Sequence, residues 1–165
     1  AGNVIGGGDW SKDRIIPDCI KSWTKNKKAI IRNPNSTRPW QHILEVIRAY
    51  MQLAILGKKN KKNINGEAFN IGPKNSQNRT VIELVKSVKK NWDIVKWKIK
   101  TNKKDKRESK LLKLNSNKSK KILSWEPILN FQESVKLTTI WYRSFYSKIN
   151  PFQISKKQIL EYEKK

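Results

Sequence analysis

The sequence predicts a mixed α/β fold, and three observations support that class. Segments with apolar residues at helical spacing alternate along the chain with short, strand-like apolar segments. The chain has 165 residues, 36% of them hydrophobic, which fits a single domain with a packed core. No continuous apolar run of about 18 residues occurs, so we expect no membrane span.

The first forty residues predict a turn, a helix, a strand and a loop in that order. Residues 1–12 are rich in glycine and indicate a turn. The segment DRIIPDCIKSW predicts a helix, and Pro17 is tolerated only in its first turn because proline lacks the backbone N–H. Residues 29–32 predict a short strand, and the turn-forming residues of 33–39 predict a loop.

The middle of the chain predicts a long helix followed by a buried strand. Residues 43–56 predict a helix, because apolar side chains at helical spacing fall on one face: Ile43, Ile47, Tyr50, Met51 and Ala54. Gly57 is expected to end this helix. Asn65-Gly66 is a turn signal, and residues 68–71 after it predict a strand that stops at Gly72-Pro73.

Two helices in the second half carry the same capping signal. Thr80 with Glu83 and Asn130 with Glu133 each place a capping residue three positions before a glutamate, ahead of an apolar helical face. Alternation over residues 95–99 predicts a half-buried strand.

Weaker signals complete the second half of the chain. Leu112 and Leu114 suggest another strand, and Ser116 is expected to cap a short helix that ends near Leu123. Ser155 with Gln158 is expected to cap a final helical turn.

The strong positive charge does not by itself identify a nucleic-acid-binding protein. Of the 37 basic residues behind the net charge of +24, thirty are Lys and seven are Arg, and they are spread over the whole chain. Proteins that read DNA bases favour arginine, whose planar fork pairs with base edges. A basic nucleic-acid-binding module therefore stays as the alternative from a different functional class. Cys19 and His42 are the only residues of their types, which excludes a disulfide framework, a cysteine cluster for zinc and multi-histidine metal sites.

The glycines near the start match neither common phosphate-binding motif. A Walker loop requires Lys followed by Ser or Thr after its glycines, whereas Asp9-Trp10 follows here. A dinucleotide fingerprint requires Gly-x-Gly-x-x-Gly, and Gly2 with Gly6 to Gly8 does not have that spacing. Two interpretations remain: a tight turn with positive φ angles, or a strand end whose loop approaches a ligand closely.

Five stretches together identify a resemblance, and it runs from residue 1 to the end of the chain. GNVIGGGDW, DRIIPDCI, IRNPNSTRPWQHILE, FNIGP and RESKLLKLNSNKSKKILSWEP resemble the C-terminal half of the CDP-glucose 4,6-dehydratases, within the extended short-chain dehydrogenase/reductase group. The resemblance implies the last elements of a Rossmann-type sheet plus a small mixed α/β substrate-binding domain. Residues 1–165 would then be the substrate-binding C-terminal portion, with the N-terminal NAD-binding portion absent.

The resemblance also implies a reaction, a cofactor and partners. In this family NAD takes a hydride from C4 of the glucose, water is eliminated across C5 and C6, and the hydride returns to C6. The expected substrate is CDP-glucose, and the full-length enzyme is expected to be a cytoplasmic homodimer. The family's catalytic Tyr-x-x-x-Lys pair is absent from this sequence, so we expect no catalytic residue here and a fragment that is inactive alone. Another sugar-nucleotide epimerase or dehydratase of the same group is the alternative.

The resemblance points to five substrate-binding residues. Arginine pairs well with a diphosphate, and by the family match Arg38 grips the phosphates while Arg14 precedes the Ile-Pro stretch that lines the site. Asn3, Asn70 and Arg107 match polar positions that face the ligand, although relatives carry His where Arg107 stands. Each of the five also has an ordinary interpretation, as a surface charge or as an amide that pairs with nearby backbone.

Three further residues near this segment have competing interpretations. Arg32 fits a base pocket or the surface equally well. His42 has the chemistry of an acid or base, but its position at a helix start favours a structural role. Trp40 has the shape to stack on a cytosine, yet loop packing is the preferred interpretation.

Overall fold

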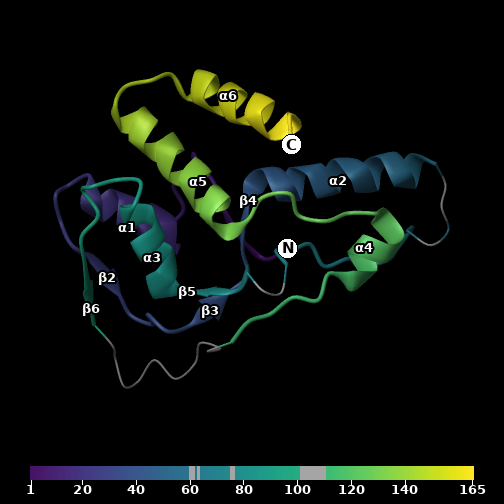
Figure 1. Ribbon diagram of the computed structural model, residues 1–165, viewed down its shortest axis with the longest axis horizontal. Helices are drawn as coiled ribbons and strands as arrows, with labels where there is room; N and C mark the ends of the chain where they lie inside the picture. The colour runs from purple at the N-terminus through teal and green to yellow at the C-terminus, as the bar shows by residue number, and fades with distance from the viewer. Residues whose placement is uncertain (60–61, 63, 75–76, 101–110) are drawn as a thin grey trace.

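The computed structural model describes residues 1–59, 62, 64–74, 77–100 and 111–165, which form an α/β fold (Figure 1). The strands are β1 (Asn3–Ile5), β2 (Ala29–Ile31), β3 (Thr37–Arg38), β4 (Trp40–His42), β5 (Arg79–Thr80) and β6 (Trp97–Ile99). The helices are α1 (Ile15–Trp23), α2 (Ile43–Lys58), α3 (Val81–Lys89), α4 (Asn117–Leu123), α5 (Phe131–Tyr146) and α6 (Pro151–Glu163).

The strands of the described residues pair two by two. β1 and β4 are parallel, with Asn3 opposite Trp40 and Ile5 opposite His42. β2 and β6 are also parallel, whereas β3 and β5 form a short antiparallel pair. Helices α2 and α5 both pack against the β1–β4 pair.

Two apolar clusters hold these elements together. The larger one joins α1, α3 and α5 to β2 and contains Trp23, Leu84, Val135 and Tyr142, each at most 2% exposed. The smaller one joins α2 and α4 through Ala49, Leu123 and Trp125. Figure 1 shows the same division, with α1 and α3 at one end of the molecule and α2 and α4 at the other.

Local sequence signals account for most helix starts. Both predicted capping boxes are present: Thr80 and Asn130 accept from the backbone N–H of Glu83 and Glu133, whose side chains accept in return. The last helix differs from the prediction. It begins at Pro151, where Asn150 accepts from the N–H of Phe152, rather than at a cap formed by Ser155. Proline at the first helical position gives up no hydrogen bond, which explains the earlier start.

The strand predictions were less accurate. Residues 1–12 contain β1 as well as a turn, and the loop predicted at 33–39 contains β3. Residues 68–71 and the segment around Leu112 do not form strands, although a single bridge pairs Leu111 with Thr37. The misplaced strands are two to four residues long and depend on partners distant in sequence, which a local pattern does not reveal.

The glycine loop is shaped by close packing against two helices. A Cβ added at Gly7 would lie 2.0 Å from the ring of Trp141 on α5, and one at Gly6 would lie 2.6 Å from Ile43 of α2. Gly8 has a φ of 77°, which disfavours other residues. The Tyr142 hydroxyl of α5 also donates to the backbone oxygen of Asp9 at 2.6 Å. The tight turn is therefore confirmed, whereas a close approach of this loop to a ligand stays a prediction.

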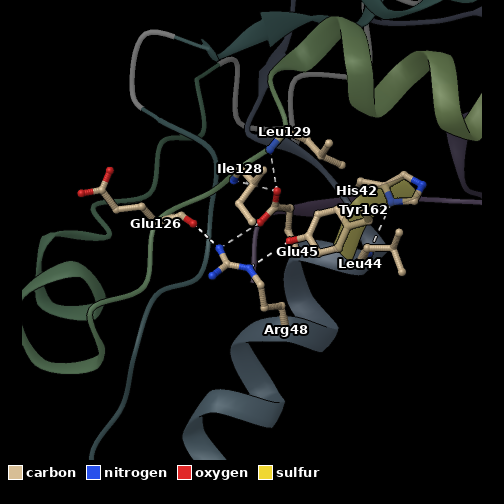
Figure 2. A network of polar contacts seen from close by, with 8 residues as sticks. All are labelled: His42, Leu44, Glu45, Arg48, Glu126, Ile128, Leu129 and Tyr162. Atoms are coloured by element: carbon tan, nitrogen blue, oxygen red, sulfur yellow. Dashed lines mark hydrogen bonds and ion pairs between the residues drawn. The ribbon is translucent and has the colours of Figure 1, made fainter. Parts of the chain in front are cut away.

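A buried carboxylate fastens α2 to the segment before α5 (Figure 2). Glu45, 1% exposed, accepts from the backbone N–H groups of Ile128 at 2.8 Å and Leu129 at 2.7 Å. Arg48 lies 3.4 Å from the second carboxylate oxygen and donates to the backbone oxygen of Glu126. The charge on Glu45 is therefore met by donors from two directions, which a buried carboxylate requires.

The same arginine reaches the C-terminal helix. The Nε of Arg48 donates to the hydroxyl of Tyr162 on α6 at 2.9 Å, and the guanidinium lies 5.5 Å from the ring centre of Trp125. Burial, together with the nearby Glu45 carboxylate, raises the pKa of Tyr162 to about 12. Tyr162 therefore stays a neutral hydroxyl at physiological pH and accepts from the arginine.

Candidate functional site

A cavity of about 400 Å³ opens beside the end of β1 and the start of α1. The wall of the cavity is formed by β1, the loop after β1 and the first turn of α1. One residue each from β3, β4 and α3 completes the wall. The residues that line it are Ala1 to Gly6, Asp9, Asp13 to Pro17, Arg38, Trp40 and Val81. Cavities of a few hundred cubic ångströms are typical of small-ligand sites.

Arg14 stands at one side of this cavity, held by two contacts. Its Nη2 donates to the backbone oxygen of Val4 at 3.3 Å, and its Nε lies 3.3 Å from the Asp9 carboxylate. The Arg14 side chain is 51% exposed, so it can still turn towards a ligand. Burial alone would raise the pKa of Asp9, but hydrogen bonds from Ser11 and the charges of Arg14 and Lys21 hold it below its ordinary value. Asp9 is therefore ionised when it pairs with Arg14.

The start of α1 adds unpaired backbone donors to the same cavity. Arg14 is the N-cap residue, and no side chain among the described residues caps the helix. The first turn carries free N–H groups because no earlier carbonyl is in reach, and Pro17 has no N–H to leave unpaired. Ile15 and Ile16 line the cavity, so this helix end presents its positive pole to the space.

Arg38 supplies the second guanidinium of the site. It lies on β3, is 7% exposed, and donates from Nη1 to the backbone oxygen of Thr37 at 2.8 Å. A guanidinium carries five N–H donors in a planar fork, a geometry that suits a phosphate. Next to it, Trp40 is 3% exposed and its indole donates to the backbone oxygen of Arg79 at 3.0 Å. That bond supports the packing role expected for Trp40.

The structure gathers three of the five predicted residues in this cavity. Asn3, Arg14 and Arg38 all line it, although they are up to 35 positions apart in sequence. Asn70 does not line it, and its amide donates to the backbone oxygen of Asn115 at 3.2 Å. Arg107 lies outside the described residues. Asp9 and Asp13 also line the cavity, and the sequence does not indicate them, because a carboxylate repels a phosphate.

His42 does not lie in this cavity and has a structural role. It is 1% exposed, and its Nδ1 accepts from the backbone N–H of Leu44 at 3.4 Å, which caps α2. Its Nε2 is buried and has no hydrogen-bond partner among the described residues. Burial lowers the pKa of His42 to about 4, so the ring is neutral over the physiological range.

Neutral His42 makes stability depend on pH. Because the folded pKa lies below the ordinary value of 6.5, the unfolded chain binds the proton first as pH falls. The contribution of His42 is complete above pH 6.5 and declines towards pH 4, by about 1.4 kcal/mol per pH unit. We expect His42→Asn, which keeps a capping side chain, to flatten the decline in the free energy of unfolding measured by urea denaturation. Superimposable pH profiles for the two proteins would contradict this assignment.

The described residues contain neither a candidate metal site nor a candidate membrane-spanning helix. No group of three or more His, Cys, Asp or Glu side chains there could hold a metal ion. Within the same residues, the helices are too short or too polar to span a bilayer.

Comparison of sequences gives one curated relative. The chain is 35% identical over 163 residues to CDP-glucose 4,6-dehydratase of Salmonella typhimurium, a match that covers 98% of this chain and 45% of the relative. The chain thus spans less than half the length of this relative. No protein-family model matches the chain.

Comparison of structures gives the same type of fold. An epimerase from Methanothermobacter thermautotrophicus matches with a TM-score of 0.74 and 20% identity, over 94% of this chain and 44% of its own. UDP-glucuronic acid 4-epimerase of Bacillus cereus, in complex with UDP-glucuronic acid and NAD, matches at 0.71 and 20%, over 88% and 44%. dTDP-glucose 4,6-dehydratase of Bacillus anthracis, in complex with NAD, matches at 0.70 and 22%, over 87% and 43%.

These comparisons confirm the resemblance and the fold class expected from the sequence. The described residues have a mixed α/β fold that matches part of the epimerase and dehydratase structures above. The sequence, over nearly its whole length, is similar to a dehydratase that acts on a nucleotide sugar.

Proposed function

We propose that this chain is the CDP-sugar-binding portion of an NAD-dependent CDP-glucose 4,6-dehydratase, a lyase that converts CDP-glucose to CDP-4-keto-6-deoxyglucose and water. The similarity to the Salmonella typhimurium enzyme supports the reaction and the nucleotide. A cavity that gathers two arginines and an uncapped helix end supports the binding role. A cytoplasmic location and a homodimeric full-length enzyme are further predictions of the resemblance.

The binding role follows from the charges around the cavity. A diphosphate carries roughly two negative charges, and Arg38 and Arg14 supply two positive ones that donate in fixed directions. The N–H groups at the start of α1 add donors that need no side-chain ordering. Asn3 lies on the same wall and offers an amide to the phosphate or the sugar. The observation that carries the proposal is this convergence of three kinds of donor on one cavity.

To bind a diphosphate, Arg14 must exchange its partner Asp9 for the ligand. In the absence of ligand, Arg14 is paired with Asp9, and Asp13 also lines the cavity. A diphosphate would take over Arg14, and Asp9 would keep its hydrogen bond from the Ser11 N–H, which is 3.0 Å long. The Asp9 carboxylate therefore remains solvated and bonded when its arginine turns away.

The residues of this chain do not fit an NAD site of the family's type. The glycines after β1 lack the dinucleotide spacing, and their close contacts with Trp141 and Ile43 show that they serve helix packing. The Tyr-x-x-x-Lys pair is also absent from the sequence. We therefore assign NAD binding and the hydride steps to another portion of the protein, and we assign no catalytic residue here.

The nucleotide assignment can be tested on the chain by thermal unfolding with CDP, UDP, dTDP and GDP. We expect CDP to raise the midpoint most, because a ligand at 100 times its Kd adds about 2.7 kcal/mol to the folded state. A larger shift with UDP or dTDP would instead favour another sugar-nucleotide enzyme of the group. Equal shifts with all four would refute the nucleotide assignment. Binding to random duplex DNA that falls steeply with salt would favour the nucleic-acid alternative.

A further inference from the structure

The cavity beside β1 and α1 holds as many acidic as basic side chains. Arg14 and Arg38 line it, and so do Asp9 and Asp13. Thirty of the chain's 37 basic residues are lysines, yet no lysine of the described residues lines this cavity. A site built only to attract phosphate would gain from the cations that are abundant elsewhere in the chain. The two carboxylates therefore need an explanation of their own.

Asp9 is a fixed negative charge beside the arginine that would bind the ligand. Its Oδ1 accepts from the backbone N–H of Ser11 at 3.0 Å, and its Oδ2 lies 3.3 Å from the Nε of Arg14. Its backbone oxygen accepts from the hydroxyl of Tyr142 on α5 at 2.6 Å. Burial acts to raise the pKa of Asp9, but the hydrogen bonds from Ser11 and the nearby positive charges outweigh it. The carboxylate is therefore ionised at neutral pH.

Ligands that share a cytidine diphosphate differ in the charge at its far end. In a nucleotide sugar the second phosphate is esterified to the sugar, so the diphosphate carries about two negative charges. In free CDP that phosphate is a monoester with a second pKa of about 6, which brings the total to about three charges at pH 7.5. CTP carries about four by the same count. A free nucleotide thus places extra negative charge where the sugar would begin.

We propose that Asp9 determines specificity in this cavity, because its carboxylate repels the extra charge of a terminal phosphate and so favours a diphosphate esterified to a sugar over free CDP or CTP. The inference rests on the proposed function. Any phosphate that Arg14 binds also lies close to Asp9, because the two side chains are in contact. Repulsion between charges in a partly buried site is stronger than in bulk water.

The overall charge of the chain makes this order of affinities a demanding expectation. A protein with a net charge of +24 attracts the more highly charged anion more strongly. Without a local repulsion, CTP would therefore bind more tightly than CDP, and CDP more tightly than CDP-glucose. An opposite order requires a negative charge within the cavity itself, and Asp9 is the carboxylate that contacts Arg14 there.

The test compares dissociation constants for three ligands. Titration calorimetry with CDP-glucose, CDP and CTP is performed at pH 7.5 and an ionic strength of about 0.15 M, without divalent cations. Asp9→Asn removes the charge but keeps an oxygen that can accept from the Ser11 N–H, and Asp9→Glu keeps the charge. The matched control is Asp93→Asn, which changes the net charge equally at an exposed residue between α3 and β6 that does not line the cavity.

We expect the unmodified chain to bind CDP-glucose most tightly and CTP least tightly. In Asp9→Asn the ratio of the Kd for CTP to the Kd for CDP-glucose should fall by about threefold or more, because the most highly charged ligand gains most when the repulsion is removed. Asp9→Glu and Asp93→Asn should leave this ratio unchanged. A purely structural role of Asp9 would change the affinity for all three ligands alike, so the ratio separates specificity from folding.

Two results would overturn the inference and leave the proposed function intact. One is binding of all three ligands with the same ratio in a folded Asp9→Asn protein as in the unmodified chain. The other is tighter binding of CTP than of CDP-glucose by the unmodified chain, a result that does not depend on the folding of any variant. If none of the three ligands binds, the proposed function is wrong, and the inference that rests on it is wrong as well.

Discussion

Arg38→Ala is expected to weaken binding of CDP-glucose by about ten- to a hundredfold, from the 1.5–3 kcal/mol typical of a charge-assisted hydrogen bond. Arg38 is 7% exposed and lines the cavity, so its bonds to a phosphate would be shielded from water. Such bonds are stronger than those made by an exposed side chain. Titration calorimetry with CDP-glucose measures the change in Kd directly.

Two further variants are tested beside Arg38→Ala, one within the cavity and one away from it. Because Arg38 is buried, its loss could also disturb the fold, so Arg14→Ala is tested beside it. The Arg14 side chain is 51% exposed, so we expect the Arg14→Ala protein to keep its fold. The same substitution should still weaken binding of CDP-glucose. Arg143→Ala removes an arginine of α5 that donates to the backbone oxygen of Asn91, away from the cavity, and should leave Kd unchanged. If the Arg38→Ala protein is folded and its Kd for CDP-glucose is unchanged, Arg38 does not bind the ligand and the site lacks its central residue.

The parts of the fold that the sequence predicted correctly depend on neighbours along the chain. Thr80 with Glu83 and Asn130 with Glu133 satisfy backbone donors within one helical turn, so the residues themselves specify the start. The short strands depend instead on pairing across the molecule, as Thr37 does with Thr80. The face of α2 shows a third case. Periodicity finds an apolar stripe but does not say which element covers it, and Glu45 on the opposite side is the buried residue.

The candidate site shows the same contrast. Arg14 and Arg38 stood out because arginine is scarce in a lysine-rich chain and because the family match falls on them. That they line one cavity follows from the packing of α1 and β3 against β1 and β4, which is not visible locally. Asp9 was missed for a chemical reason. An acidic residue is unexpected beside a phosphate until its pairing with Arg14 is seen.

Glu45→Ala is expected to lower the free energy of unfolding by about 3–5 kcal/mol, the range for breaking a buried ion pair. The substitution leaves the backbone N–H groups of Ile128 and Leu129 without their acceptor. It also leaves Arg48 without its carboxylate partner. Each orphaned buried donor costs about 1–3 kcal/mol, which supports the same range. Urea denaturation of both proteins gives the difference.

Glu45→Gln separates the hydrogen bonds from the charge. Glutamine keeps one oxygen that can accept from Ile128 and Leu129, but it removes the ion pair with Arg48, so a smaller loss is expected. Tyr162→Phe removes only the hydroxyl that accepts from Arg48 and should cost about 1 kcal/mol. If Glu45→Ala cost no more than Tyr162→Phe, the carboxylate would not be the residue that fastens α2 to the segment before α5. We therefore expect the loss in free energy of unfolding to be largest for Glu45→Ala, smaller for Glu45→Gln and smallest for Tyr162→Phe. This order tests whether the buried charge of Glu45 or the hydroxyl of Tyr162 holds α2, the segment before α5 and α6 together.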